Sequence, residues 1–112
     1  MHEVSLMKSM VDILDEEIRS SEVGEVKIIH LEVGKLRYIV PEILVSCFER
    51  LPKNEKLKTA RINLEILPVK LRCKKCFEET LPEGERFACC KCSSNDFDII
   101  QGNEFRIKAI EW

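Results

Sequence analysis

The sequence predicts an α+β fold, in which a small sheet of about three strands and two helices carries an inserted zinc-ribbon-like module. Three observations predict it. Apolar residues recur at helical spacing in two segments, and in other segments they alternate with polar residues. Two CxxC pairs stand between the last two alternating segments. The length of 112 residues suits one compact domain with a small metal-stabilised module.

The N-terminal half predicts a helix, a strand and a second helix. In residues 4–18 the apolar residues step by three or four positions, which indicates an amphipathic helix. Residues 25–34 are rich in Val and Ile and stop at a glycine, which is typical of a strand. Residues 40–51 return to helical spacing, and Pro41 suits the first turn of that helix, where its missing N–H costs nothing.

The C-terminal half predicts two strands, one on each side of the cysteines. Residues 60–71 alternate Ile or Leu with polar residues, and we expect Pro68 to bend this strand or to lie at an edge. Residues 104–112 alternate again. We expect this final strand to return to the same sheet as the strands before the cysteines.

This order of elements predicts two domains. If the final strand joins the earlier ones, the chain must leave the sheet and come back to it. We therefore expect an α/β domain of residues 1–72 and 99–112, and a zinc-binding domain of residues 73–98 inserted between two strands.

Composition and charge argue against several classes of protein. The formal net charge is −2, so the chain lacks the basic character of a nucleic-acid-binding domain. No apolar run approaches membrane-spanning length, and charged residues interrupt the N-terminal segment too often for a signal peptide. We therefore expect the six cysteines to lie in a reducing cytoplasm, where paired CxxC motifs bind metal more often than they form disulfides.

The paired CxxC motifs predict a structural zinc site. Cys73 and Cys76 form the first pair, and the second lies in the sequence CCKC. There Cys92 has two candidate partners, Cys89 and Cys90. The spacing of the first pair favours Cys89 and leaves Cys90 as a spare thiol. Two such turns, often called knuckles, can close a tetrahedron of thiolates around Zn²⁺.

The first three residues suggest a metal site of another kind. The α-amine of Met1, the peptide nitrogen of His2 and the His2 imidazole can close two adjacent chelate rings on one ion. Ni²⁺ and Cu²⁺ favour such square, nitrogen-rich sites, and Glu3 offers an amide nitrogen or a carboxylate as a fourth ligand. The alternative is that these residues only begin the helix. We interpret His30, inside a predicted strand, as a surface or hydrogen-bonded core histidine.

Together these motifs resemble the HypA/HybF family of hydrogenase nickel-incorporation proteins over nearly the full chain. The resemblance rests on MHE at the N-terminus, on LEVGKL, VPE and CFE, on LPV, on the two CxxC pairs and on QGNEFRI. It implies a nickel-binding α/β domain with an inserted zinc domain, and nickel ligands from Met1, His2 and Glu3. The zinc ligands that it implies are Cys73, Cys76, Cys89 and Cys92.

The sequence departs from the family pattern in the second knuckle. Cys90 stands where the family usually has proline, and Ser93 stands where glycine is common. The departure supports the pairing of Cys89 with Cys92. It leaves open whether Cys90 joins the zinc site or replaces one of its ligands.

The resemblance also implies a function. Members of this family receive Ni²⁺ and pass it to the large subunit of nickel–iron hydrogenase, together with a HypB-type GTPase, and some also serve urease maturation. We therefore expect a cytoplasmic nickel metallochaperone, not an enzyme, with Ni²⁺ as cargo and Zn²⁺ as a structural cofactor. We expect a monomer or weak homodimer that binds neither nucleic acid nor membranes.

Two other classes stand as alternatives. A zinc-ribbon interaction module or nucleic-acid adaptor would need an exposed cluster of Lys and Arg with aromatic residues. Residues 70–75 hold such basic residues, but glutamates follow at once. A zinc enzyme would need an open coordination position and a general base, and the sequence offers neither.

Overall fold

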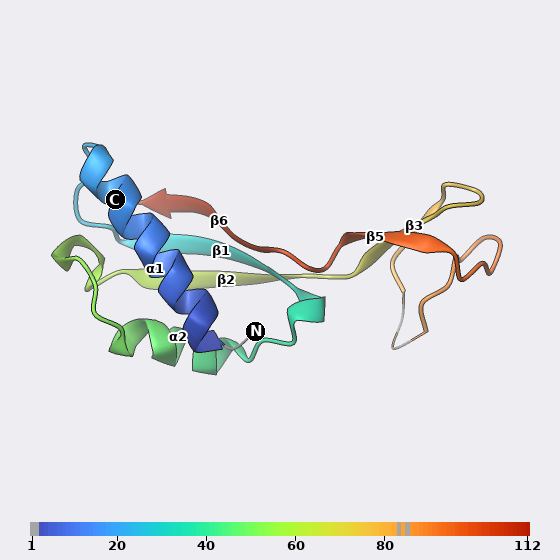
Figure 1. Cartoon of the computed structure of the whole chain (residues 1–112), viewed down its shortest axis with the longest axis horizontal. Coiled ribbons are helices and arrows are strands. Elements are labelled where there is room, and N and C mark those ends of the chain that lie inside the picture. Colours follow the sequence, from blue (N-terminus) through green and yellow to red (C-terminus); the bar gives the residue numbers. More distant parts are fainter. Residues whose placement is uncertain (1–2, 83, 85) are drawn as a thin grey trace. The chain divides into compact units, whose positions relative to one another are not determined.

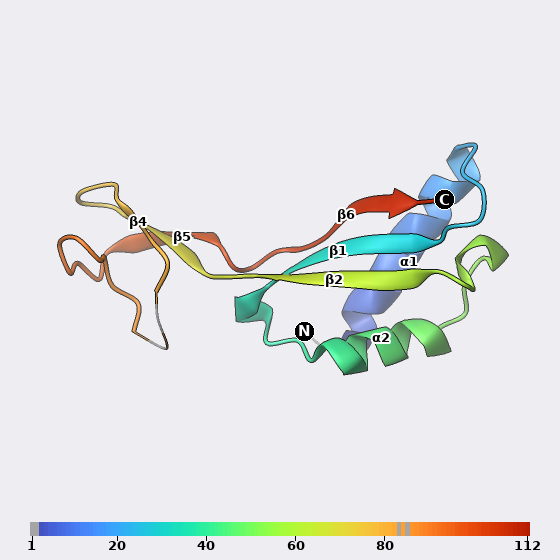
Figure 2. The same cartoon turned by 180° about the vertical axis from the view of Figure 1, so that it is seen from behind.

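The structure is a computed structural model, and it describes residues 3–82, 84 and 86–112. Within these residues no helix has the length and apolar character needed to cross a bilayer. Figures 1 and 2 show the chain from two sides. Its elements are α1 (Glu3–Ser20), β1 (Ile28–Gly34), η1 (Lys35–Arg37), α2 (Pro41–Arg50), η2 (Glu55–Leu57), β2 (Arg61–Leu67), β3 (Lys70–Cys73), β4 (Glu79–Thr80), β5 (Phe97–Gln101) and β6 (Phe105–Glu111).

The chain folds into two compact units. The first, which we call the α/β unit, contains the chain up to Glu32 with Ile39–Glu65 and Phe105–Trp112. The second, which we call the cysteine unit, contains Val33–Tyr38 and Ile66–Glu104. The cysteine unit thus includes a short segment that precedes the cysteines by more than thirty residues in the sequence. The domain limits that we expected from the sequence stay a prediction.

The first sheet has the strand order β2-β1-β6, so the final strand does return to the sheet of the earlier strands. The Arg61 amide donates to the Lys27 carbonyl at 2.9 Å, and His30 bonds Asn63 further along, so β1 and β2 run in the same direction. Parallel neighbours need a crossover connection, and α2 provides it. The predicted α+β fold of two helices and a small sheet with an inserted module is therefore confirmed.

The core of the α/β unit lies between its two helices and one face of the sheet. Residues 28–33 of β1 alternate between half-buried and buried, as expected of a strand with one covered face. The α1 helix buries one stripe at the predicted helical spacing. Its buried residues are Leu6, Met7, Met10, Val11, Leu14 and Ile18.

The cysteine unit contains a second, antiparallel sheet with the strand order β4-β3-β5. The segment that we predicted as one strand, residues 60–71, is two strands here. β2 ends at Leu67 and β3 begins at Lys70, so Pro68 interrupts the strand as expected. Leu71 pairs with Thr80 on one side and with Ile99 on the other, which fixes β3 as the central strand.

Residues 34–37 are bound to residues 102–104 within the cysteine unit. The Gly34 amide donates to the Glu104 carbonyl at 2.7 Å, and the Leu36 amide donates to the Gly102 carbonyl at 2.9 Å. The two backbones approach so closely that a Cβ on Gly34 would lie 1.9 Å from the Gly102 carbonyl oxygen. Position 34 therefore accepts only glycine, because the obstacle is backbone and cannot rotate away.

We expect Gly34→Ala to lower the free energy of unfolding by about 3 kcal/mol or more, because the new methyl group must push two backbones apart. Gly24→Ala is the matched control. A Cβ on Gly24 would meet Trp112 Cδ1 at 3.7 Å, an ordinary contact, so its effect should stay within about 0.5 kcal/mol. Urea unfolding of the two variants measures both values, and equal stabilities would contradict the close approach.

Candidate metal centre

The first knuckle begins where β3 ends. Cys73 is the last residue of that strand, and the chain then turns back through Cys76. The amides of Lys75 and Cys76 donate to the Cys73 Sγ at 3.4 and 3.5 Å, and the Phe77 amide donates to the Cys73 carbonyl at 3.0 Å. The turn therefore aims backbone dipoles at the sulfur, which stabilises a thiolate there.

The second knuckle repeats this geometry. The amides of Lys91 and Cys92 donate to the Cys89 Sγ, each at 3.4 Å. The Ser93 amide donates to the Cys89 carbonyl at 3.0 Å. The repeat settles which cysteine opens the second knuckle in this structure, because Cys89 occupies the position that Cys73 occupies in the first.

Each knuckle ends on a residue with left-handed backbone. Phe77 has φ 62° and Ser93 has φ 60°, and both are four residues beyond the first cysteine of their knuckle. This conformation is unfavourable for residues with a side chain and is most easily adopted by glycine. In each knuckle this residue turns the next amide, that of Glu78 or Ser94, toward the sulfur of the second cysteine, Cys76 or Cys92.

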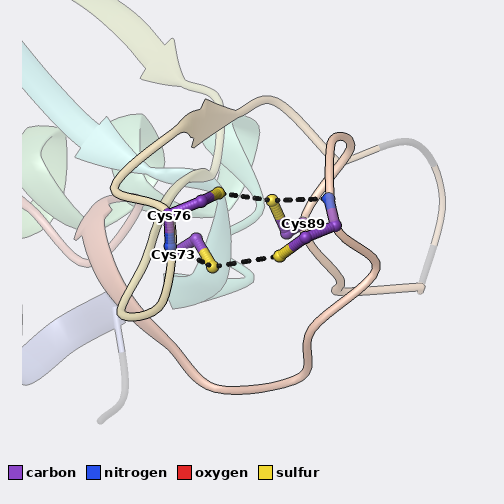
Figure 3. Close-up of side chains that lie close together, drawn as sticks. Cys73, Cys76 and Cys89 are labelled. Atoms are coloured by element: carbon purple, nitrogen blue, oxygen red, sulfur yellow. Dashed lines mark hydrogen bonds between the residues drawn. The ribbon is translucent and has the colours of Figure 1, made fainter.

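The four cysteines of the two knuckles form one cluster. Their Sγ atoms all lie within 4.8 Å of one another. Cys73 Sγ is 3.5 Å from Cys92 Sγ, and Cys76 Sγ is 3.5 Å from Cys89 Sγ (Figure 3). Four thiolates around one Zn²⁺ at about 2.3 Å would be separated by about 3.8 Å. The donor set and its spacing therefore fit a tetrahedral metal ion.

Cys90 lies outside this cluster. Its side chain is exposed, and its amide donates to the Thr80 hydroxyl at 3.1 Å. Thr80, 8% exposed, is the one buried polar or charged residue among those that the structure describes. It fastens the second knuckle to β4. Sequence reasoning did not identify Thr80, because its role depends on a pairing between distant segments.

The two cysteines that open the knuckles have the more acidic thiols. Donation from the Cys76 amide lowers the pKa of the Cys73 thiol, and donation from the Cys92 amide lowers the pKa of the Cys89 thiol to about 6. The pKa of the Cys76 thiol is raised to about 12. There the hydrogen bond from the Glu78 amide, which lowers it, is outweighed by removal from water and by the neighbouring thiols. The lowered pKa values of Cys73 and Cys89 favour the thiolate, the form that binds metal.

The structure describes only one residue of the expected N-terminal site, Glu3. Met1 and His2 lie outside the described residues. Glu3 is the first residue of α1 and is half-buried, and its Oε1 accepts a long hydrogen bond, 3.5 Å, from the Val40 amide at the start of α2. Within the ranges that the structure describes, the four cysteines are the one group of three or more His, Cys, Asp or Glu side chains at ligand spacing.

His30 is held by hydrogen bonds on the face of the first sheet. Its Nε2 lies 2.6 Å from Glu111 Oε2, and its Nδ1 lies 3.0 Å from Asn63 Nδ2. Asn63 can only donate through this nitrogen, so Nδ1 accepts, and Nε2 carries the proton that Glu111 accepts. His30 thus links β1 to both neighbouring strands, as a hydrogen-bonded surface histidine does.

Fold and site together define a class: a small α+β metal-binding protein with an inserted four-cysteine module. Comparison with known families identifies the family to which this chain belongs. Residues 1–112 match the model of the family described as hydrogenase/urease nickel incorporation, metallochaperone, HypA. The chain belongs to the HypA family.

Individual relatives agree with this assignment. The hydrogenase maturation factor HypA of Desulfatibacillum aliphaticivorans is 38% identical over 112 residues, covering 99% of this chain and 86% of the relative. The protein of the same name from Campylobacter jejuni is 30% identical over 108 residues, covering 96% and 95%. The solution structure of the Ni metallochaperone HypA from Helicobacter pylori superposes with a TM-score of 0.74 at 26% identity, covering 99% and 97%.

We expect Cys90→Ser to bind Zn²⁺ as the unchanged chain does, because the Cys90 side chain lies outside the sulfur cluster. Cys89→Ser should lose stoichiometric Zn²⁺, because it removes one of the four clustered thiols. Metal analysis after gel filtration measures both. Loss of Zn²⁺ from Cys90→Ser with retention in Cys89→Ser would reverse the assignment.

We expect Ser93→Gly to raise the free energy of unfolding of the zinc-loaded chain by up to about 1 kcal/mol. Glycine removes the cost of the left-handed backbone, which is about 1–2 kcal/mol. Glycine also gives the unfolded chain more conformational entropy, and this offsets part of the gain. Ser93→Val should lower the free energy of unfolding, because β-branched residues fit the left-handed conformation worst. Urea titration ranks the two variants, and a stabilised valine variant would contradict the backbone argument.

Proposed function

We propose that this chain is a nickel metallochaperone that binds Ni²⁺ at its first three residues and delivers it to the large subunit of nickel–iron hydrogenase during maturation. The observation that carries the proposal is the match of the whole chain to the HypA family, with the MHE sequence at its start. Urease maturation is the other client that this family description supports.

The four clustered cysteines are the ligands that we assign to a structural Zn²⁺. Bound zinc would supply a rigid cross-link between two turns and no reactive position, because Cys73, Cys76, Cys89 and Cys92 would complete its coordination. The cysteine unit needs such a cross-link, because it buries few side chains of its own. A closed thiolate site also supports a function other than catalysis.

The ligands that we assign to Ni²⁺ are the Met1 amine, the peptide nitrogen and imidazole of His2, and Glu3. The position of Glu3 in the first turn of α1 supports this assignment. The first N–H groups of a helix have no carbonyl partner within it, so peptide nitrogens at this end are free to bind a metal. The positive end of the helix dipole also favours the negative charge of a deprotonated amide.

For Glu3, we assign the amide nitrogen as the nickel ligand and not the carboxylate. The carboxylate already accepts a hydrogen bond from the Val40 amide, at 3.5 Å. Ni²⁺ favours square sites rich in nitrogen, and the Glu3 amide continues the run of nitrogens that Met1 and His2 begin.

Delivery requires partners as well as ligands. Such nitrogen ligands bind Cu²⁺ more tightly than Ni²⁺, so affinity alone cannot select the cargo. We therefore propose that selection comes from docking to a HypB-type GTPase and to the hydrogenase subunit, in the cytoplasm. A ligand set at the end of the chain suits transfer, because few protein contacts must break when the ion leaves.

The alternative, a zinc-ribbon adaptor for nucleic acid, loses support from the charges in the cysteine unit. The Lys74 ammonium lies 3.8 Å from an Asp96 carboxylate oxygen and 3.7 Å from one of Asp98. The basic cluster of residues 70–75 is therefore partly neutralised, whereas a phosphate-binding surface needs its cations available.

The sharpest test of the nickel site is a Gly-Ser extension ahead of Met1. The extension preserves every side chain, but it converts the primary amine into a peptide nitrogen that must lose a proton before it can bind. We expect nickel affinity to fall by about a hundredfold or more, since one ligand and its chelate ring are lost. Calorimetric titration of the zinc-loaded protein measures this affinity, with zinc content and circular dichroism as controls.

His2→Ala completes this test, because it removes the imidazole and keeps the amine. Both variants should lose nickel while the fold and the zinc content stay unchanged. If both bind Ni²⁺ as the unchanged protein does, the N-terminal site is wrong and the ion binds elsewhere. If only the extension has no effect, the amine is not a ligand.

A further inference from the structure

A groove in the cysteine unit has no role in either metal site. It has a volume of about 500 Å³, and all of its lining residues belong to that unit. Val69, buried, lines it beside Pro68, which interrupts the strand. Leu36 of η1 and the segment around Leu81 also line it. The groove therefore joins a segment that precedes the cysteines to the loop between the two knuckles.

The described part of the lining is mostly apolar. Besides the aliphatic side chains it includes the aromatic rings of Tyr38 and Phe87. Lys35 is the one charged residue among the lining positions that the structure describes. No acidic group in the described part of the chain pairs with its ammonium, whereas the nearby Arg37 already donates to the Asn103 carbonyl at 2.7 Å. A cation beside apolar surface that has no acidic partner among the described residues favours a carboxylate as its partner.

Tyr38 holds an exposed aromatic ring at this groove at a cost in backbone energy. Its φ of 51° lies in the left-handed region, and its side chain is 80% exposed. Because the ring is exposed, its burial contributes little energy to offset the backbone strain. Backbone strain of this kind is concentrated at binding sites. Tyrosine is also among the residues enriched at protein interfaces.

The openness of the groove favours a polypeptide over a small molecule. Pockets for small molecules bury about 70–90% of the ligand surface. Here Leu81 is 60% exposed and Tyr38 is 80% exposed, so a small ligand would leave much of its surface in water. A chain that continues past the groove on both sides can cover these two side chains.

We propose that this groove binds an extended acidic segment of a partner polypeptide. One apolar side chain of that segment packs on Val69 and Phe87, and an Asp or Glu carboxylate pairs with the Lys35 ammonium. The proposal is independent of the nickel ligands, because none of the lining residues belongs to the N-terminal site. It assigns to the cysteine unit a role in recognition beyond holding a metal.

The test starts from a phage-displayed library of random short peptides, selected on the zinc-loaded full-length protein. Enriched peptides should share an apolar residue within two positions of Asp or Glu. The most enriched peptide is then synthesised and titrated against variants. Lys35→Glu should weaken it about tenfold or more, because two like charges then meet. Lys108→Glu, the same charge change on β6 of the α/β unit, should leave its affinity unchanged.

Tyr38→Gly separates a binding role from a structural one. Glycine relieves the left-handed backbone, so the free energy of unfolding should hold or rise, while peptide affinity should fall about fivefold with the loss of the ring. Leu81→Ser should also weaken the peptide and leave zinc content intact.

Three results would overturn the proposal. The first is a selection that enriches no peptide above the empty support. The second is an enriched peptide that binds Lys35→Glu and Tyr38→Gly as tightly as it binds the unchanged protein. The third is self-association in sedimentation that Leu81→Ser abolishes, since the groove would then be occupied by a second copy of the chain.

Discussion

The cysteine unit depends on the convergence of four sulfurs from two short turns. Apart from Leu71 and Val69 it buries few aliphatic side chains, so apolar burial alone supplies little of the energy needed to order the chain. The left-handed backbone at Phe77 and Ser93 turns the next amide of each knuckle, that of Glu78 or Ser94, toward the second cysteine sulfur. The shape of the strands and loops around them therefore depends on the thiol cluster and on what it binds.

Much of the fold was predictable, because it follows from local periodicity. The helical stripe of α1 and the alternation in β1, β2 and β6 need only neighbouring residues to be recognised. β5 was not predicted, because it lacks alternation: its pairing with β3, as Leu71 with Ile99, joins residues 28 positions apart. The place of Val33–Tyr38 in the cysteine unit also depends on bonds to residues near 102, which no local pattern reveals.

The four clustered cysteines illustrate what spacing can and cannot determine. Spacing predicted the four cysteines that the structure brings together, and it favoured Cys89 over Cys90. It could not show why the choice matters. Only the three-dimensional turn reveals that Cys89 receives two backbone amides while the Cys90 amide is committed to Thr80. For the N-terminus, the sequence offered both the amide nitrogen and the carboxylate of Glu3 as ligands. The hydrogen bond from the Val40 amide to the Glu3 carboxylate is a contact between distant residues that the sequence could not reveal.

The two kinds of ligand that we propose would let one small protein bind two metals at separate sites. A closed cage of thiolates favours Zn²⁺ and leaves no position for an acceptor to attack, so an ion held there exchanges slowly. Peptide nitrogens at the end of a helix are accessible from solvent and bind only after losing protons, so binding there responds to a competing ligand or proton. A carrier needs the second property for its cargo and the first for its own shape. The four clustered cysteines come from the turns beside β3 and β5, whereas Glu3, the described member of the proposed nickel site, begins α1. A change in one proposed ligand set can therefore alter one property and spare the other.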